Sequence, residues 1–330
     1  MKRILLVQTG FLGDVVLSTP VIAAVHQRHP GCELWMLVTP QAKGLLGADP
    51  LVAGVLTFDK RKSHAGIRGL WRLARELRGF NFQCCYALHR SYRTALLLWL
   101  ARIPKRIGFK DAALSFLYHV RAVRPRQAHE VRRKLALLGA EGPLPGLDDR
   151  IRLFACQHAP QIAEELSGPY IAVVPGSAWH TKRWHPAGYR KVVEYLIQRK
   201  KAVVLLGSKD ELQTGMEVGK GLAALNLVGL TTLAETMWII QNAALVLCND
   251  SLALHLASGF NVPALAVFCA TSPAFGFGPW KNRAEVVELK GLACKPCRPH
   301  GGRACPLGTE ACMRDLDASE VIAALERLLS

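Results

Sequence analysis

Three polar residues, Asn249, Asp250 and Ser251, interrupt a stretch that is otherwise apolar, and His255 follows them after about one helical turn. The apolar run 244–248 before them is typical of a buried strand, and the residues after them are typical of a helix. A carboxylate and a hydroxyl at such a junction could bind a ligand, because open α/β sheets bind ligands at the carboxyl ends of their strands. The same residue types also cap helices in proteins of every function, and a histidine on an apolar helix is common in cores.

A second polar junction, PGSAWHTKRW, occupies residues 175–184 between another expected strand and helix. Gly176 and Ser177 could offer a backbone N–H and a hydroxyl to a diphosphate, while Lys182 neutralises its charge. A solvated basic turn is the alternative interpretation.

Two further carboxylates lie in glycine-containing loops that follow expected strands. Glu211, or its neighbour Asp210, could accept hydrogen bonds from a ribose, although a helix-capping acid fits the local sequence equally well. Asp14 begins a helix after the first strand and could act as a general base toward a hydroxyl, or simply stabilise the helix dipole. The preceding glycines do not complete G-x-G-x-x-G, so a nicotinamide enzyme is poorly supported.

Four of the ten cysteines cluster near the C-terminus with the spacing C-x2-C-x7-C-x6-C. Only the first pair has the spacing of a zinc site, so structural zinc, a disulfide pair and plain packing all remain open. These residues are Cys294, Cys297, Cys305 and Cys312. We expect the remaining cysteines to be reduced core residues. They are Cys32, Cys84, Cys85, Cys156, Cys248 and Cys269.

The elements that must position these residues alternate between strands and helices, which indicates βαβ units and parallel sheets. In the first half the pattern predicts strands at 2–7, 34–38, 55–58 and 83–88 and helices at 15–29, 67–78 and 92–102. In the second half it predicts strands at 170–174, 202–206, 225–228, 244–248 and 264–268 and helices at 186–199, 233–241 and 319–329, with one more helix after the loop 207–211. A turn or linker rich in glycine and proline occupies 139–146. We therefore expect an α/β protein of two doubly wound domains, 1–165 and 166–330, facing each other across a cleft.

Composition excludes a disordered chain, because half of the 330 residues are apolar. The net charge of +17 is concentrated in residues 1–150, where 24 basic residues face 10 acidic ones. This excess suggests a phosphorylated glycolipid, an anionic membrane surface or nucleic acid as partner, and no nucleic-acid-binding motif supports the last of these. The N-terminus lacks the continuous apolar core of a signal peptide, and the longest uncharged apolar run in the first half, 94–101, is too short to cross a bilayer. We expect a cytoplasmic protein.

Four segments in this order resemble glycosyltransferase family 9, the bacterial heptosyltransferases of lipopolysaccharide core assembly. They are TGFLGDVVLSTP, PGSAWHTKRWHPAGY, LLGSKDE and NDSLALHLASGFNVPALAVFCATSP. KRW and NDS…H are most similar to the heptosyltransferase II branch. The resemblance implies a GT-B fold with an N-terminal acceptor-binding domain and a C-terminal nucleotide-sugar-binding domain, whose last helix typically packs back on the first. It also implies inverting, metal-independent transfer from ADP-heptose to inner-core lipopolysaccharide, with no cofactor, at the cytoplasmic surface of the inner membrane.

Carried over by position, Asp14 matches the general base of that family. The residues expected to bind the donor nucleotide sugar are Gly176, Ser177, Lys182, Glu211, Asp250, Ser251 and His255. Leu252 replaces a glycine that is common after the family's NDS serine, and Cys269-Ala270-Thr271 replaces the commoner Gly-Pro-Thr/Ser. These departures leave the exact donor and acceptor open.

The basic first half suits a phosphorylated acceptor. Candidate contacts are Lys60, Arg61, Lys62, Arg90, Arg93 and Arg106. Two alternatives remain: a GT-B enzyme for another nucleotide sugar, whether a glycosyltransferase or a hydrolysing epimerase, and a non-catalytic scaffold at the membrane surface.

Overall fold

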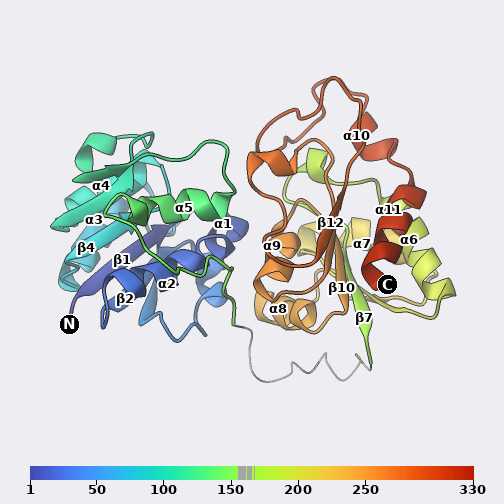
Figure 1. The fold of residues 1–330 in the computed structure, drawn as a ribbon, viewed down its shortest axis with the longest axis horizontal. Coiled ribbons are helices and arrows are strands. Elements are labelled where there is room, and N and C mark those ends of the chain that lie inside the picture. The colour runs from blue at the N-terminus through green and yellow to red at the C-terminus, as the bar shows by residue number, and fades with distance from the viewer. Residues whose placement is uncertain (155–160, 162–165, 167) are drawn as a thin grey trace. The chain divides into compact units, whose positions relative to one another are not determined.

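The computed structural model describes residues 1–154, 161, 166 and 168–330. The chain divides into two compact units, Met1–Phe154 and Ala155–Ser330, which we describe separately (Figure 1). Residue 165, where the sequence placed the end of the first domain, lies outside the described residues.

The first unit is built on a parallel sheet in the order β3-β2-β1-β4-β5-β6. Its strands are β1 (Arg3–Gln8), β2 (Glu33–Val38), β3 (Gly54–Thr57), β4 (Cys84–Ala87), β5 (Lys105–Phe109) and β6 (Val120–Ala122). Its helices are α1 (Leu12–Val16), α2 (Thr19–Arg28), α3 (Gly66–Gly79), α4 (Tyr92–Leu100) and α5 (Glu130–Gly139). Helix α2 packs beside α5 and α3 beside α4 (Figure 1), as in a doubly wound unit.

The second unit repeats this arrangement with the order β12-β11-β10-β7-β8-β9. Its strands are β7 (Tyr170–Val174), β8 (Ala202–Leu205), β9 (Leu225–Asn226), β10 (Leu245–Asn249), β11 (Ala264–Val267) and β12 (Ala284–Val287). Its helices are α6 (Pro186–Gln198), α7 (Leu212–Gly219), α8 (Leu233–Gln241), α9 (Leu252–Gly259), α10 (Ala311–Arg314) and α11 (Ala318–Leu329). The predicted α/β class with two doubly wound parallel sheets is confirmed.

The interiors of the central strands are apolar because helices cover both faces of each sheet. In β1, residues 4–7 are fully buried between β2 and β4. In β10, residues 245–248 are equally buried between β7 and β11. The strands that end at the candidate site residues are therefore the most deeply embedded parts of both units.

The structure corrects the sequence prediction at several elements. Strands β5 and β6 and helix α5 lie in a region where we predicted none, and β12 follows the strand that we took as the last. The helix expected over 15–29 is divided into α1 and α2, because Pro20 has no N–H to continue the ladder. The carbonyl of Val16 instead accepts from the Thr19 hydroxyl at 2.9 Å.

Further contacts define the end of each unit. The segment 139–146 is a turn of the first unit, since Arg28 at the end of α2 donates to the carbonyls of Glu141 and Gly142 at 3.0 and 2.6 Å. The apolar face of the last helix, α11, packs on α6, β11 and β12 of the second unit, and its packing on the first domain, which the family resemblance implies, stays a prediction. In the part of the chain that the structure describes, no helix combines the length and apolarity needed to cross a membrane.

Candidate functional site

Both sheets reverse their strand order at one place, between β1 and β4 in the first unit and between β7 and β10 in the second. At such a reversal the loops from neighbouring strands run to opposite faces, which opens a crevice at the strand carboxyl ends. Asp14 lies in the helix that follows β1, and Asp250 comes directly after β10. The sequence thus placed its two principal carboxylates at the positions where this fold binds ligands.

Asp14 stands in the first turn of α1, and its side chain is 29% exposed. The carboxylate lies over Gly10, where an added Cβ would come within 3.0 Å of Asp14 Oδ2. The Gly10 N–H donates to Gln8 Oε1 at 3.2 Å, which fixes the loop below the carboxylate. A glycine at this position therefore lets the carboxylate fold over the loop.

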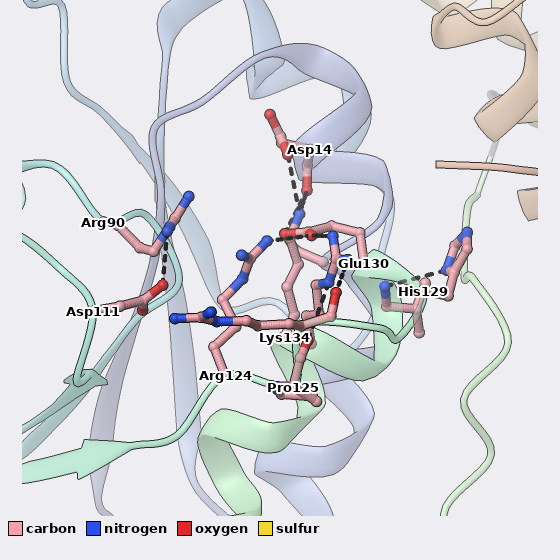
Figure 2. A network of polar contacts seen from close by, with 12 residues as sticks. Asp14, Arg90, Asp111, Arg124, Pro125, His129, Glu130 and Lys134 are labelled. Atoms are coloured by element: carbon pink, nitrogen blue, oxygen red, sulfur yellow. Dashed lines mark hydrogen bonds and ion pairs between the residues drawn. The ribbon is translucent and has the colours of Figure 1, made fainter. Parts of the chain in front are cut away.

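Lys134 of α5 reaches Asp14 from 120 residues away (Figure 2). Its ammonium Nζ donates to the Asp14 backbone carbonyl at 2.6 Å and lies 3.5 Å from Asp14 Oδ1. Lys134 is 1% exposed. Sequence reasoning missed this residue because it predicted no element over EVRRKLALLG, and a lysine next to two arginines gives no local sign of burial.

Further polar groups gather at this sheet edge. Lys60, beyond β3, donates to the Thr9 carbonyl at 2.9 Å, and His89, beyond β4, lies 3.2 Å from Thr9 Oγ1. Burial, together with the charge of Arg93, lowers the pKa of Lys60 to about 8. Burial and then Lys60 lower the pKa of His89 to about 4, although Asp14 opposes this. His89 is therefore neutral near pH 7, while Lys60 keeps its charge there.

The basic residues proposed for the acceptor do not share one environment. Arg90 is paired with Asp111 at 2.8 Å on the surface (Figure 2), and exposed Arg93 lies beside the Tyr92 hydroxyl. Exposed Arg61 and Lys62 follow β3, and both backbone N–H groups donate to Asp59 Oδ1.

Arg106 has a structural role, which corrects its place among the acceptor contacts. It lies near the amino end of β5, and its guanidinium donates to the carbonyls of Ile103 and Leu117 at 2.6 and 2.9 Å. The candidate base follows the carboxyl end of β1, so Arg106 is directed to the wrong edge of the sheet.

In the second unit, buried Asn249 ties β10 to the loop that follows β7. Its Nδ2 donates to the carbonyls of Pro175 and Gly176 at 2.8 and 3.2 Å, and its Oδ1 accepts from the Trp184 N–H at 2.9 Å. The side chain thus joins the two polar junctions of the sequence. It shapes the loop and presents no free polar atom of its own to a ligand.

Lys182 and Asp250 form an ion pair of 2.7 Å at the strand reversal of the second sheet. Thr271, which follows β11, donates its hydroxyl to the same carboxylate oxygen at 2.7 Å. Ser177 donates its hydroxyl to the Asp250 backbone carbonyl at 3.2 Å. The structure therefore brings together residues that the sequence separates by almost a hundred positions, and adds Thr271 to them.

Glu211 lies against Gly176, where an added Cβ would come within 1.9 Å of Glu211 Oε1. Its other oxygen, Oε2, accepts from the Ser208 N–H at 2.7 Å and the Ser208 hydroxyl at 2.8 Å, which is a capping box. The alternative reading of Glu211 as a capping acid is thus confirmed. Contact with a ribose through Oε1 stays a prediction.

Ser251 is the N-cap residue of α9, but its side chain makes no cap hydrogen bond. Among the described residues its buried hydroxyl has no hydrogen-bond partner. Buried polar atoms are rarely left unsatisfied, so a hydroxyl of this kind at a helix N-terminus suits a ligand oxygen. His255 follows one turn later on α9 and is 5% exposed.

The cysteine segment packs against the loop that carries Lys182. The Thr181 N–H donates to the Gly302 carbonyl at 3.1 Å, and the Gly302 N–H donates to Thr181 Oγ1 at 2.8 Å. Cys294, Cys297, Cys305 and Cys312 all carry free thiols. Burial raises the pKa of Cys312 to about 11, with Cys297 as the next cause. Over the described residues, no three His, Cys, Asp or Glu side chains are grouped so as to hold a metal.

Known proteins resemble this chain over most of its length. Residues 70–306 match the family model described as glycosyltransferase family 9 (heptosyltransferase). Lipooligosaccharide heptosyltransferase 2 of Haemophilus influenzae is 26% identical over 308 residues, which cover 87% of this chain and 88% of the relative. Lipopolysaccharide heptosyltransferase 2 of Escherichia coli is 26% identical over 313 residues, with the same coverage of 87% and 88%.

Solved structures show the same fold. A family 9 glycosyl transferase from Veillonella parvula has a TM-score of 0.88 at 21% identity, covering 99% of this chain and 97% of the other. E. coli ADP-heptose heptosyltransferase II has a TM-score of 0.82 at 23% identity, covering 100% and 98%. TibC of enterotoxigenic E. coli, described as an iron-containing dodecameric glycosyltransferase, has a TM-score of 0.63 at 16% identity, covering 99% and 76%.

Proposed function

The chain belongs to glycosyltransferase family 9, and from this membership we propose that it transfers a heptose from ADP-heptose to the inner core of lipopolysaccharide. The acceptor is a Kdo- or heptose-bearing lipid A. The relatives that match over most of the chain are heptosyltransferases of lipopolysaccharide and lipooligosaccharide, which supports this choice of substrates. We further propose that transfer inverts the configuration at the anomeric carbon of the heptose.

In this reaction an acceptor hydroxyl oxygen attacks the anomeric carbon of the donor, and the bond from that carbon to the diphosphate oxygen breaks. Asp14 takes the proton of the hydroxyl, while ADP leaves with the bonding electrons. Lys182 and the backbone N–H groups around Ser177 stabilise the charge that develops on the diphosphate. A single displacement of this kind inverts the configuration.

The observation that carries the donor assignment is the convergence of four separate segments at the carboxyl ends of β7, β8, β10 and β11. Lys182, Asp250 and Thr271 meet within 2.7 Å contacts, and Glu211 lies against Gly176. The unsatisfied hydroxyl of Ser251 lies at the start of α9, the position where helices bind phosphate. These groups supply donors for a diphosphate and an acceptor for a sugar hydroxyl.

We also propose that the protein works in the cytoplasm, bound peripherally to the inner membrane through its first unit. Among the described residues every large exposed aromatic side chain belongs to that unit: Phe11, Trp71, Tyr92, Trp99 and Phe116. On α3, exposed Ile67 and Trp71 alternate with exposed Arg68, Arg72 and Arg75. Apolar side chains set among arginines favour an anionic bilayer surface.

No catalytic metal takes part in the proposed step, since Lys182 and the backbone amides supply the positive charge that a metal would otherwise bring. TibC, which shares the fold, is described as iron-containing, so the point needs its own measurement. Turnover should survive exhaustive treatment with chelator. Loss of turnover that is restored by a divalent or ferric ion would refute metal independence.

The test is turnover of ADP-heptose with a purified inner-core acceptor, followed by ADP release and by mass of the product. Turnover measured with a panel of other nucleotide sugars tests whether the enzyme uses a donor other than ADP-heptose. ADP release without acceptor would indicate a hydrolase, and ADP binding without turnover would indicate a scaffold. We expect Asp14→Asn to abolish transfer while ADP affinity stays near the wild-type value, and substantial residual turnover would exclude the base role.

A further inference from the structure

We propose that Lys134 is the positioning residue for Asp14, holding the carboxylate in the orientation that proton transfer requires. This inference rests on the proposed function, in which Asp14 is the general base. The ammonium makes both of its polar contacts within the described residues to Asp14, one to the carbonyl oxygen and one to Oδ1. It therefore fixes the backbone and the side chain of the same residue.

The Asp14 backbone carbonyl can accept a hydrogen bond from Lys134 because helix α1 ends just beyond Asp14. In a continuous helix this carbonyl would accept from the backbone N–H of Ser18. That N–H instead donates to Val15 at 3.0 Å, and the Ser18 hydroxyl donates to the Asp14 carbonyl at 2.6 Å. Lys134 supplies the second donor, so an ammonium and a hydroxyl replace the helical hydrogen bond.

The helix that carries Lys134 is itself anchored at its start. Glu130, the first residue of α5, is paired with Arg124 at 2.8 Å and with Arg133 at 3.3 Å (Figure 2). All three side chains are mostly buried. Lys134 follows one turn after Glu130, so this network fixes the position from which the lysine approaches Asp14.

Burial makes the pairing obligatory. An ammonium that is 1% exposed is costly to keep charged unless an anion lies beside it. Asp14 provides that anion, and its two oxygens then have different surroundings: Oδ1 faces the ammonium, and Oδ2 lies over Gly10. We assign Oδ2 as the oxygen that accepts the proton, because the ammonium already engages Oδ1.

Other charged groups near this carboxylate must be considered with the lysine. His89 and Lys60 lie at the same sheet edge, and His89 responds to the charges of Asp14, Lys134, Lys60 and Arg90. His89 is neutral near pH 7, so it adds no cation beside Asp14 at the working pH. Lys134 is thus the buried cation in direct contact with the base.

The first experiment compares Lys134→Met with Lys134→Arg in the full-length protein. Met keeps the apolar volume without the charge, and we expect kcat to fall by roughly tenfold to a hundredfold because the base is displaced. ADP affinity should stay within twofold, roughly, since ADP is proposed to bind the second unit. Lys134→Arg keeps a positive charge at this position and should restore kcat at least partly. A folded Lys134→Met variant with wild-type kcat would overturn the proposal.

The second experiment remains informative if Lys134→Met folds poorly. The unfolding midpoints of Asp14→Asn, Lys134→Met and the double variant form a double-mutant cycle. Asp14→Asn alone leaves a buried ammonium without its anion, so we expect the double variant to be more stable than Asp14→Asn while remaining inactive. Additive losses in the double variant would overturn the pairing. The cycle needs no substrate, so a wild-type protein that fails to turn over ADP-heptose would refute the proposed function without affecting this result.

Discussion

Lys182 Nζ lies 2.7 Å from Asp250 Oδ2, and the two side chains are only 12% and 4% exposed. The carboxylate also accepts from the Thr271 hydroxyl at 2.7 Å. Asp250 therefore holds in place the cation that we assign to the donor diphosphate. Both partners have to be kept together, because a buried charge without its partner is strongly destabilising.

We expect Lys182→Ala to weaken ADP binding by roughly tenfold to a hundredfold, since a hydrogen bond to a charged group contributes about 1.5–3 kcal/mol. Titration calorimetry with ADP measures this directly. Lys191→Ala, which removes an exposed lysine of α6, is the matched control and should bind ADP as the wild type does. Unchanged ADP affinity in a folded Lys182→Ala variant would remove the lysine from the donor site.

Gly176→Ala should disrupt the donor loop through a steric clash with Glu211. The new Cβ would lie 1.9 Å from Glu211 Oε1, so the loop or the capping box has to move. Overpacking of this kind costs typically about 1–3 kcal/mol of folding free energy. Urea unfolding and ADP titration should both show the loss. Gly44→Ala is the control, because nothing lies within 4 Å of its Cβ.

A paired variant tests the cause of that loss. Shortening the acid in Gly176→Ala/Glu211→Ala removes the clashing oxygen, so we expect the double variant to lose less stability than the two single losses added together. Strict additivity would mean that the two residues do not compete for the same space.

Much of this architecture could be predicted from the sequence, because local signals and the fold agree. Buried parallel strands read as short apolar runs, and β7 was predicted with its observed bounds. The polar residues after β1 could be placed at the carboxyl edge of the first sheet, and those after β7 and β10 at the carboxyl edge of the second, because the strands of a parallel sheet end together. Glu211 was the ambiguous case, since capping and sugar binding favour the same residue type in the same loop.

The rest required contacts between distant segments. Lys134 gives no local signal, because whether a lysine of a basic helix is solvated or buried depends on what packs against that helix. Arg106 was misjudged for the same reason: its positive charge suggested an acceptor contact, but its Nε and Nη1 donate to the carbonyls of Leu117 and Ile103. An excess of basic residues in a sequence indicates a positive electrostatic field. Only the fold shows which of these cations already interact with other groups of the protein.

Membrane association through α3 can be tested by vesicle sedimentation. A triple variant in which Gln replaces Arg68, Arg72 and Arg75 should bind more weakly to vesicles that contain phosphatidylglycerol, by roughly 1 kcal/mol per arginine. Trp71→Ala should weaken it further, since this tryptophan is 48% exposed. Met216→Ala changes an apolar residue in the second unit that is 59% exposed and should bind vesicles normally. Equal losses in the control would refute a specific membrane face.

The lowered pKa of His89 makes the free energy of unfolding depend on pH in the acid range. Its pKa is about 4 in the folded chain against 6.5 for an ordinary histidine, so the unfolded chain binds more protons between these values. Stability linked to His89 is therefore present above pH 6.5 and is lost as the pH falls toward about 4. The loss is at most about 3 kcal/mol. Urea unfolding of the wild type and His89→Gln across this range should show a steeper acid loss in the wild type, and parallel curves would exclude the linkage.

Lys60 should give acceptor recognition a dependence on alkaline pH. Burial and the charge of Arg93 hold its pKa at about 8, well below the ordinary value of 10.5. The Lys60 side chain is positively charged near neutral pH and loses this charge as the pH rises through about 8. Its attraction for a phosphorylated acceptor should therefore decline in that range. We expect kcat/KM for the acceptor to fall above this pH while ADP affinity changes little. Lys60→Arg carries a guanidinium that stays protonated, so its profile should remain flat over the same range. If the wild type and Lys60→Arg decline together, the alkaline limb belongs to another group and Lys60 does not bind the acceptor as a cation.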